Sequence, residues 1–138
     1  MNEGKYILTQ VTNLIPRQIF LRLVKKYNGD YRVREFNCTN QLQHLFFGQL
    51  TSCESLRDIC LCLKQHNDIL YGLGIKTSVN ESSLSRANES RDCRIYEGLG
   101  LASSRLFARC MPKCVLSTLF LRIMISLPLI LPENPALL

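Results

Sequence analysis

Apolar side chains recur at helical spacing soon after the start of the chain. Between residues 16 and 28 they form one stripe, while most basic side chains lie off it. Pro16 suits the first position of a helix, and Asn28-Gly29 supplies a left-handed stop. The pattern predicts an amphipathic helix between these signals and a shorter helix before it, over residues 6–12. The stripe consists of Ile19, Phe20, Leu23, Val24 and Tyr27.

The same spacing returns after residue 38. Thr39 is expected to cap a helix whose apolar face carries Leu42, Leu45 and Phe46. Gly48 lies in this stretch and would allow close packing against a neighbouring helix. Residues 31–36, which connect this helix to the previous one, alternate in polarity and predict a short strand or an extended connection.

Two further helices are expected before residue 98. Thr51-Ser52-Cys53-Glu54 matches a capping box, and apolar residues follow it at helical spacing up to Leu63. After a glycine break at residues 72–74 and a polar loop, Ser82 or Ser83 is expected to cap a helix over 83–95. Residues 1–98 therefore predict an all-α domain, a small bundle of short helices with a helix-turn-helix-like element formed by the last two.

The composition changes after Gly98. No acidic residue occurs between Glu97 and Glu133, and leucine, serine and arginine make up 18 of the 40 residues in 99–138. These three amino acids have the most codons, so they are over-represented when a gene is read out of frame. We expect a separate, hydrophobic tail over 99–138 that is poorly ordered or ill-packed, and that has the composition of a frameshifted segment.

The chain is basic, with a net charge of +6 and an isoelectric point of about 9.1, which favours a polyanionic partner. Half of the excess lies in the tail, because residues 1–98 hold 13 basic and 10 acidic side chains. The seven cysteines form no disulfide framework and no zinc-site spacing, so we expect reduced thiols and no metal. The first residues lack the signal-peptide pattern, and a cytoplasmic location is expected.

The polar helix expected over 83–95 is the best candidate for a functional surface. Arginine pairs with guanine, asparagine pairs with adenine, and serine and lysine bind phosphate. A second basic cluster consists of Lys25, Lys26, Arg32 and Arg34, around Tyr27 and Tyr31. The alternative for both is a solvated face with no partner. The DNA-binding candidates are Ser85, Arg86, Asn88, Arg91, Arg94, Lys25 and Lys26.

Five segments occur in this order over residues 1–98: GKYILTQ, IPRQIF, FNCTNQLQHLFFGQLT, SLRDI and SLSRANESRDCRIYE. Together they resemble the N-terminal domain of a bacterial insertion-sequence transposase of the DDE class. The resemblance implies a helical domain that binds the double-stranded DNA of transposon ends. In that family an RNase H-like domain with metal-binding carboxylates follows and performs the reaction.

After residue 98 this sequence departs from the family pattern. Two-metal catalysis needs converging carboxylates, whereas Glu54, Asp58, Glu89 and Asp92 lie on predicted helices with capping or surface roles. The expectation is a truncated, non-enzymatic DNA-binding remnant without catalytic residues or cofactors. Self-association stays open. Two alternatives remain: a small membrane-associated protein anchored by residues 115–132, although no membrane partner is expected, and a helical regulator that binds DNA or protein.

Overall fold

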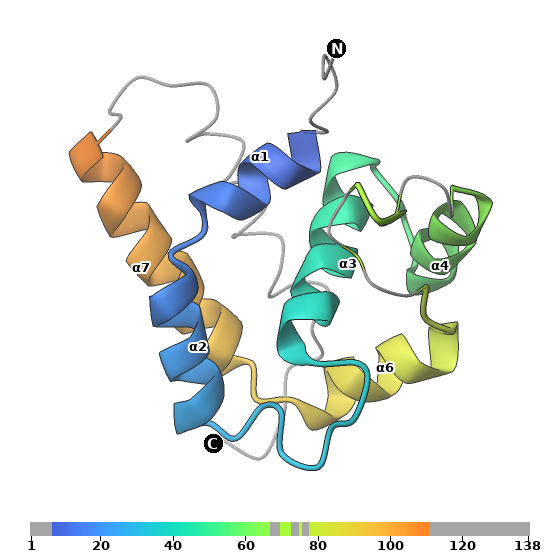
Figure 1. The fold of residues 1–138 in the computed structure, drawn as a ribbon, viewed down its shortest axis with the longest axis horizontal. Coiled ribbons are helices and arrows are strands. Elements are labelled where there is room, and N and C mark those ends of the chain that lie inside the picture. Colours follow the sequence, from blue (N-terminus) through green and yellow to red (C-terminus); the bar gives the residue numbers. More distant parts are fainter. Residues whose placement is uncertain (1–6, 67–69, 73–74, 76–77, 111–138) are drawn as a thin grey trace. The chain divides into compact units, whose positions relative to one another are not determined.

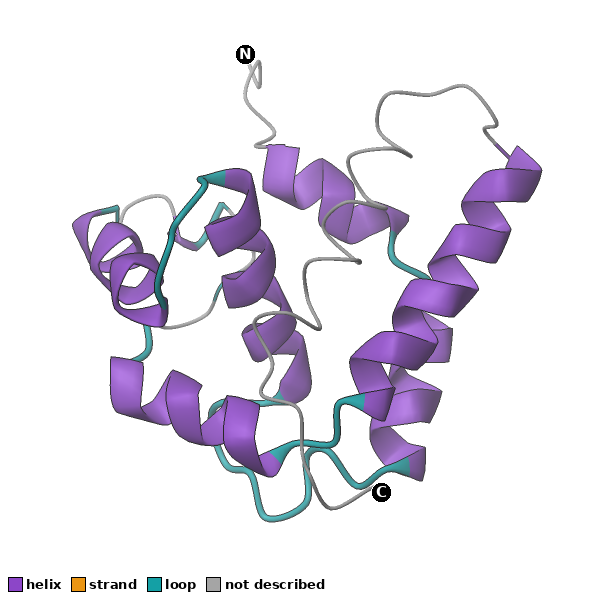
Figure 2. Cartoon of the chain, turned by 180° about the vertical axis from the view of Figure 1, so that it is seen from behind, coloured by secondary structure: helices purple, strands orange, loops and turns teal. Residues whose placement is uncertain are grey.

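A computed structural model describes residues 7–66, 70–72, 75 and 78–110 (Figure 1). Every regular element among these residues is a helix, and none is a strand (Figure 2). The all-α prediction is confirmed, while residues 31–36 form turns and bends in place of the strand considered from their alternation. The helices are α1 (Ile7–Leu14), α2 (Arg17–Lys26), α3 (Cys38–Leu50), α4 (Leu56–Gln65), α6 (Glu81–Ser90) and α7 (Arg94–Cys110).

Contacts divide the chain into two compact units. The first combines Met1–Leu14 with Arg32–Ala87, and the second combines Ile15–Tyr31 with Asn88–Leu138. Of the helices, α1, α3 and α4 belong to the first unit, and α2 and α7 belong to the second. Helix α6 begins in the first unit and ends in the second. Each unit therefore combines segments that are far apart in the sequence.

In the first unit, α3 packs against both α1 and α4. Its fully buried Leu45 and Phe46 confirm the predicted apolar face, and Ile59 and Leu63 of α4 are also buried. A Cβ atom at Gly48 would lie 2.4 Å from Cδ1 and 2.6 Å from Cγ1 of Ile59, so glycine permits this contact. Helices α3 and α4, joined by residues 51–55, are consecutive helices that pack against each other in this unit. The helix-turn-helix-like element predicted from the helices at 52–65 and 83–95 stays a prediction.

The helix ends of the first unit differ from the predicted caps. Asn37 caps α3 by accepting a hydrogen bond from the backbone N–H of Asn40 at 2.8 Å, so the assignment to Thr39 was wrong. Ser55 caps α4 by accepting from the N–H of Asp58 at 3.1 Å. Thr51 instead closes α3, and its hydroxyl donates to the Phe47 carbonyl at 2.7 Å. The predicted capping box fails because Ser55, directly before the apolar run, is itself a good cap.

In the second unit, α2 lies beside α7 (Figure 1). The rings of Phe20 and Tyr96 contact each other with centroids 6.4 Å apart, and both side chains are buried. The predicted stop of α2 is confirmed: Asn28 has φ 52°, and the N–H of Gly29 donates to the Val24 carbonyl at 2.9 Å. This is the Schellman pattern of hydrogen bonds, in which the residue after the helix is left-handed.

Helix α7 runs through the predicted domain boundary at residue 98, and Leu99 is fully buried. The division into residues 1–98 and 99–138 stays a prediction. Most of the tail, including the apolar segment 115–132, lies outside the described residues, as does the prediction that it is poorly ordered. Within the part of the chain that is described, no helix is long and apolar enough to span a bilayer.

His44 links the stability of the first unit to pH. Its ring is buried, Nδ1 lies 2.7 Å from the Asn40 carbonyl, and Nε2 has no hydrogen-bond partner. Burial lowers the pKa of His44 below 6.5, outweighing the opposing effect of the Asn40 hydrogen bond. The unfolded chain therefore binds a proton more readily than the folded chain. The stability that depends on neutral His44 is present above about pH 6.5 and is lost as pH falls below it.

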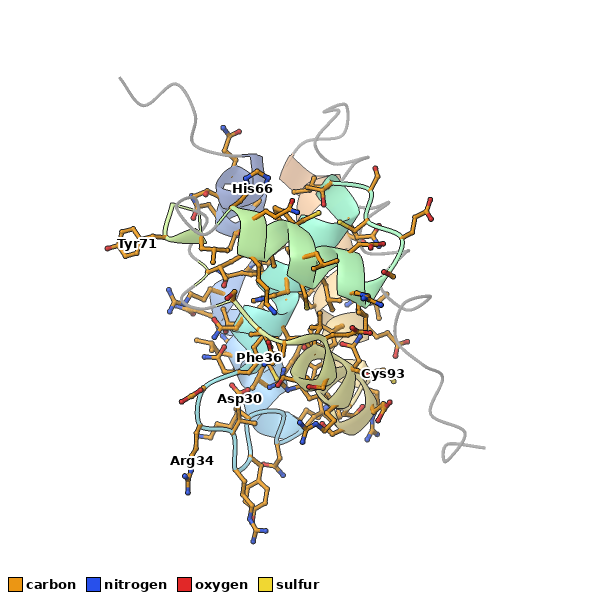
Figure 3. All side chains as sticks on the ribbon, turned by 90° about the vertical axis from the view of Figure 1, so that its right-hand side faces the viewer. Asp30, Arg34, Phe36, His66, Tyr71 and Cys93 are labelled. Atoms are coloured by element: carbon orange, nitrogen blue, oxygen red, sulfur yellow. The ribbon has the colours of Figure 1, made fainter. Side chains whose placement is uncertain are left out.

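We expect the urea concentration at the unfolding midpoint to decrease as pH is lowered from 7.5 to 5.5. The free energy of unfolding should change by up to about 1.4 kcal/mol per pH unit because of this one proton. The His44→Gln variant should show a flatter dependence, whatever its absolute stability. His66→Gln is the matched control, because His66 is the other histidine and its side chain is exposed (labelled in Figure 3). Equal slopes for the wild type and His44→Gln would show that His44 does not couple folding to pH.

Candidate nucleic-acid interface

Helix α6 begins at Glu81, earlier than predicted. The carbonyl of Asn80 accepts from the N–H groups of Ser83 and Leu84 at 3.0 and 3.1 Å. Ser82 and Ser83 therefore lie within the first turn, and the prediction that either one caps the helix was wrong. The side chain of Asn80 also accepts a hydrogen bond from Nζ of Lys64, at the end of α4, at 3.3 Å. This contact connects the start of α6 to α4.

The single helix predicted over 83–95 is two helices. Helix α6 ends at Ser90, and α7 begins at Arg94. The carboxylate of Asp92 accepts a hydrogen bond from the N–H of Arg94 at 2.9 Å, and its carbonyl accepts from the N–H of Ile95 at 3.2 Å. Aspartate side chains compete with helical hydrogen bonds in this way and so favour helix starts. Asp92 thus explains the break that apolar spacing alone did not predict.

The DNA-binding candidates on and after α6 differ in exposure. Arg86 is exposed, and its Nε donates to the Ser82 carbonyl one turn earlier at 3.3 Å. Ser85 is half-buried. Asn88 and Arg91 are only 5% and 8% exposed, respectively. Of these four side chains, Arg86 is the one that is exposed.

Three of the candidates lie at or beside the end of α2, and two of them contact one aromatic ring. Lys25 and Lys26 are exposed in the last helical turn, and Tyr27 follows them as the C-cap residue. Nζ of Lys26 lies 5.1 Å from the centroid of the Tyr27 ring, and Cζ of Arg94 lies 4.8 Å from it. Both distances fit cation–π contacts. We call Lys25, Lys26, Tyr27 and Arg94 the Tyr27 cluster.

Arg94 is held by an ion pair as well as by the ring. Its Nε lies 3.0 Å from both carboxylate oxygens of Asp92, and its Nη2 lies 2.6 Å from Oδ2. The hydrogen bonds from the Arg94 side chain lower the pKa of Asp92 below its ordinary value. Because Asp92 offsets the charge of Arg94, the net positive charge of the Tyr27 cluster comes from Lys25 and Lys26. Arg94 also contacts the face of the Tyr27 ring.

The sequence placed Lys25, Lys26 and Tyr27 together but missed Arg94 as their neighbour. The contact joins α2 to the start of α7, and no spacing rule connects such distant positions. The available signal was Asp92-Cys93-Arg94, in which an aspartate two residues before an arginine fits the start of a helix. Arg32 and Arg34, which the sequence grouped with this cluster, belong to the first unit.

No three histidine, cysteine, aspartate or glutamate side chains among the described residues come together as ligands for a metal ion. Comparison with curated proteins and with solved structures gave no match. A family model described as "Domain of unknown function (DUF4372)" matches residues 3–76, a stretch that includes Lys25 and Lys26 and ends before α6. Because this match covers more than half of the 138 residues, the chain belongs to the DUF4372 family.

Proposed function

We propose that this chain binds double-stranded DNA as the end-recognising part of an insertion-sequence transposase. The observation that carries the proposal is the Tyr27 cluster, in which exposed Lys26 contacts the Tyr27 ring and exposed Lys25 precedes it in the last turn of α2. The sequence resemblance over residues 1–98 supports the choice of transposon ends as the DNA. Membership of the DUF4372 family neither supports nor contradicts transposon ends as the DNA target.

The two lysines supply phosphate contacts in this proposal. Nζ groups of Lys25 and Lys26 are exposed, and their charge lies where the carbonyl end of α2 is negative. The attraction of the two lysines to the negative helix end therefore favours this position even when no ligand is bound. Phosphate binding adds a salt-dependent affinity for DNA of any sequence, because each neutralised phosphate releases counterions.

We assign recognition of the DNA base sequence to Arg86, since arginine pairs bidentately with guanine in the major groove. Asn88 and Arg91, which are buried, brace the helix in this proposal, and half-buried Ser85 stays near the phosphate backbone. Arg94 contacts the Tyr27 ring as described above. The proposal thus keeps all seven candidate residues but gives direct base contact to one of them.

We further propose that these 138 residues bind DNA without cutting it. Asp92 is engaged by Arg94, and Asp58 lies in the first turn of α4, where a negative charge stabilises the helix end. Metal-dependent strand cleavage needs carboxylates that converge on cations. Nicking of DNA by the pure chain with magnesium, abolished by replacing one of its own acids, would contradict this.

The test measures the affinity of the full chain for a labelled transposon-end duplex and a random duplex over a series of salt concentrations. We expect tighter binding to the transposon end, with affinity for both duplexes falling as salt rises. Lys25→Ala should weaken binding to both duplexes alike and reduce the salt slope by about one unit.

Arg17→Ala is the matched control for Lys25→Ala, because Arg17 is exposed at the opposite end of α2. Arg17→Ala should change the salt dependence of the affinity less than Lys25→Ala does. Negligible and equal binding to both duplexes at the lowest salt, by protein with the expected helical circular dichroism, would refute DNA binding. The polar and basic surfaces would then be solvated faces or sites for a protein partner.

A further inference from the structure

A second tyrosine follows the Tyr27 cluster along the chain and differs from Tyr27 in exposure. Tyr31 is 68% exposed, whereas the half-buried ring of Tyr27 is already contacted by Lys26 and Arg94. Tyr31 belongs to the second unit, as the cluster does. The DNA contacts proposed above use the charge of the lysines and the guanidinium of Arg86, so they give this exposed ring no role.

Backbone hydrogen bonds fix the position of Tyr31 at the end of α2. The N–H of Asn28 donates to the Lys25 carbonyl at 3.4 Å, and the N–H of Tyr31 donates to the Asn28 carbonyl at 3.0 Å. Asn28 is left-handed with φ 52°, and the N–H of buried Gly29 donates to the Val24 carbonyl at 2.9 Å. Two consecutive hydrogen-bonded turns therefore join Tyr31 to Lys25 and keep it at the basic end of this helix.

An exposed aromatic ring beside basic side chains has the chemistry that binds an unpaired nucleotide. The basic groups bind the phosphates, and the ring stacks on the face of a base. Inside a duplex both faces of each base are covered by neighbouring bases, so a tyrosine ring can stack only on a base that is unpaired or at a duplex end. Because every base has such a face, stacking is tolerant of sequence. It would add a preference for the form of the DNA to the sequence preference assigned to Arg86.

We propose that Tyr31 stacks on an unpaired base where single-stranded DNA adjoins the duplex, with Lys25 and Lys26 binding the phosphates beside that base. This inference rests on the DNA binding proposed above and names the form of DNA that the end of α2 binds. Asp30 precedes Tyr31 in the turn, but it is half-buried, so the turn exposes the ring more than the carboxylate.

The test measures the affinity of the full chain for three labelled DNAs that share one transposon-end duplex. The first is blunt, and the second carries a single-stranded overhang of thymidines. The third carries an overhang of the same length made of abasic nucleotides, which keep the phosphates but lack the bases. We expect the thymidine overhang to be bound about tenfold more tightly than the abasic overhang. A 2-aminopurine in place of the first unpaired thymine gives a second readout, because its fluorescence should decrease when the tyrosine ring stacks on it.

Tyr31→Leu should remove both the preference for the thymidine overhang and the decrease in fluorescence. Tyr31→Phe keeps an aromatic ring and should retain both. Tyr71→Leu is the matched control, because Tyr71 is 93% exposed but belongs to the first unit (labelled in Figure 3). It should behave as the wild type. If the Tyr31 hydroxyl only bound a phosphate, Tyr31→Phe would lose as much affinity as Tyr31→Leu, for the thymidine and the abasic overhang alike.

Wild-type protein that binds the thymidine and abasic overhangs equally would overturn the stacking proposal, as would a preference that survives in Tyr31→Leu or equal losses in Tyr31→Leu and Tyr31→Phe. If the blunt duplex is bound but unpaired bases add nothing, stacking is refuted and the proposed DNA binding stands. Negligible binding to all three DNAs would refute both. The wild-type comparison and Tyr31→Phe decide the question even if Tyr31→Leu does not fold, which circular dichroism would show.

Discussion

Gly48→Ala is expected to destabilise the first unit, although alanine is the better helix former. In a helix interior, alanine is favoured over glycine by roughly 0.5–1 kcal/mol. Against this, the new Cβ would lie 2.4 Å from Cδ1 of Ile59, whose side chain is itself buried in the contact between α3 and α4. Overpacking of this kind costs typically about 1–3 kcal/mol. The net expectation is a loss of up to roughly 2 kcal/mol, measured as a lower urea midpoint.

Gly98→Ala is the matched control, because it places alanine inside α7 with more room. There the nearest atoms are the two terminal methyl carbons of Leu23, at 3.0 and 3.1 Å, at the end of a half-buried side chain. The side chain of Leu23 can shift by a few tenths of an ångström, so helix propensity should decide the sign. We expect Gly98→Ala to keep or raise the midpoint. A gain in stability from both substitutions would show that α3 and α4 do not approach as closely as the structure has them.

The apolar pattern predicted the helices well where one face is buried. The stripe ending at Tyr27 and the stop at Asn28 were both correct, since a stripe and a left-handed residue are local signals. Gly48 was correctly singled out for close packing. These features depend on residues within a few turns of each other, which is the range over which sequence spacing is informative.

The helix ends were predicted less well, because several side chains compete to cap each one. The side chains of Thr39 and Asn37 are both suitable for capping, and Asn37 is the one whose backbone conformation lets it cap α3. The helix over 83–95 was predicted as continuous, because this polar stretch has no regular apolar repeat whose interruption would indicate a break. The hydrogen bond that the Asp92 carboxylate accepts from the Arg94 N–H marks the division into two helices. The pairing of α2 with α7 joins distant segments, and no single-sequence signal predicted it.

The candidate site was predicted by residue type but not by accessibility. Arginine and asparagine are suitable for reading DNA, yet composition does not distinguish exposed Arg86 from buried Asn88 and Arg91. Asn88 shares one side of α6 with residue 84, whereas Arg91 follows the end of the helix at Ser90. Leu84, four residues before Asn88, is fully buried and was the available signal that this side faces inward. Only the structure separated the side chains that reach solvent from those that do not.

Arg86→Ala is expected to weaken binding to a transposon-end duplex by roughly 1–3 kcal/mol and to relax sequence preference. Arg86 is exposed on α6, and the hydrogen bond from its Nε to the Ser82 carbonyl lies on the helix surface. The fold should therefore survive the substitution, with unchanged circular dichroism and urea midpoint. The measurement compares the affinities of the variant and the wild type for transposon-end and random duplexes at one fixed salt concentration.

Arg86→Lys separates base reading from charge. Lysine keeps the positive charge but lacks the planar fork that grips guanine through two parallel hydrogen bonds. If Arg86 reads a base, the lysine variant should bind the random duplex almost as the wild type does, and lose much of the preference for the transposon end. If Arg86 contacts only phosphate, Arg86→Lys should behave as the wild type on both duplexes. Arg57→Ala removes an exposed arginine of α4 and should leave the preference intact, because that side chain has no part in the proposed interface. Equal loss of preference in Arg57→Ala and Arg86→Ala would assign specificity to the overall charge and remove Arg86 from its role.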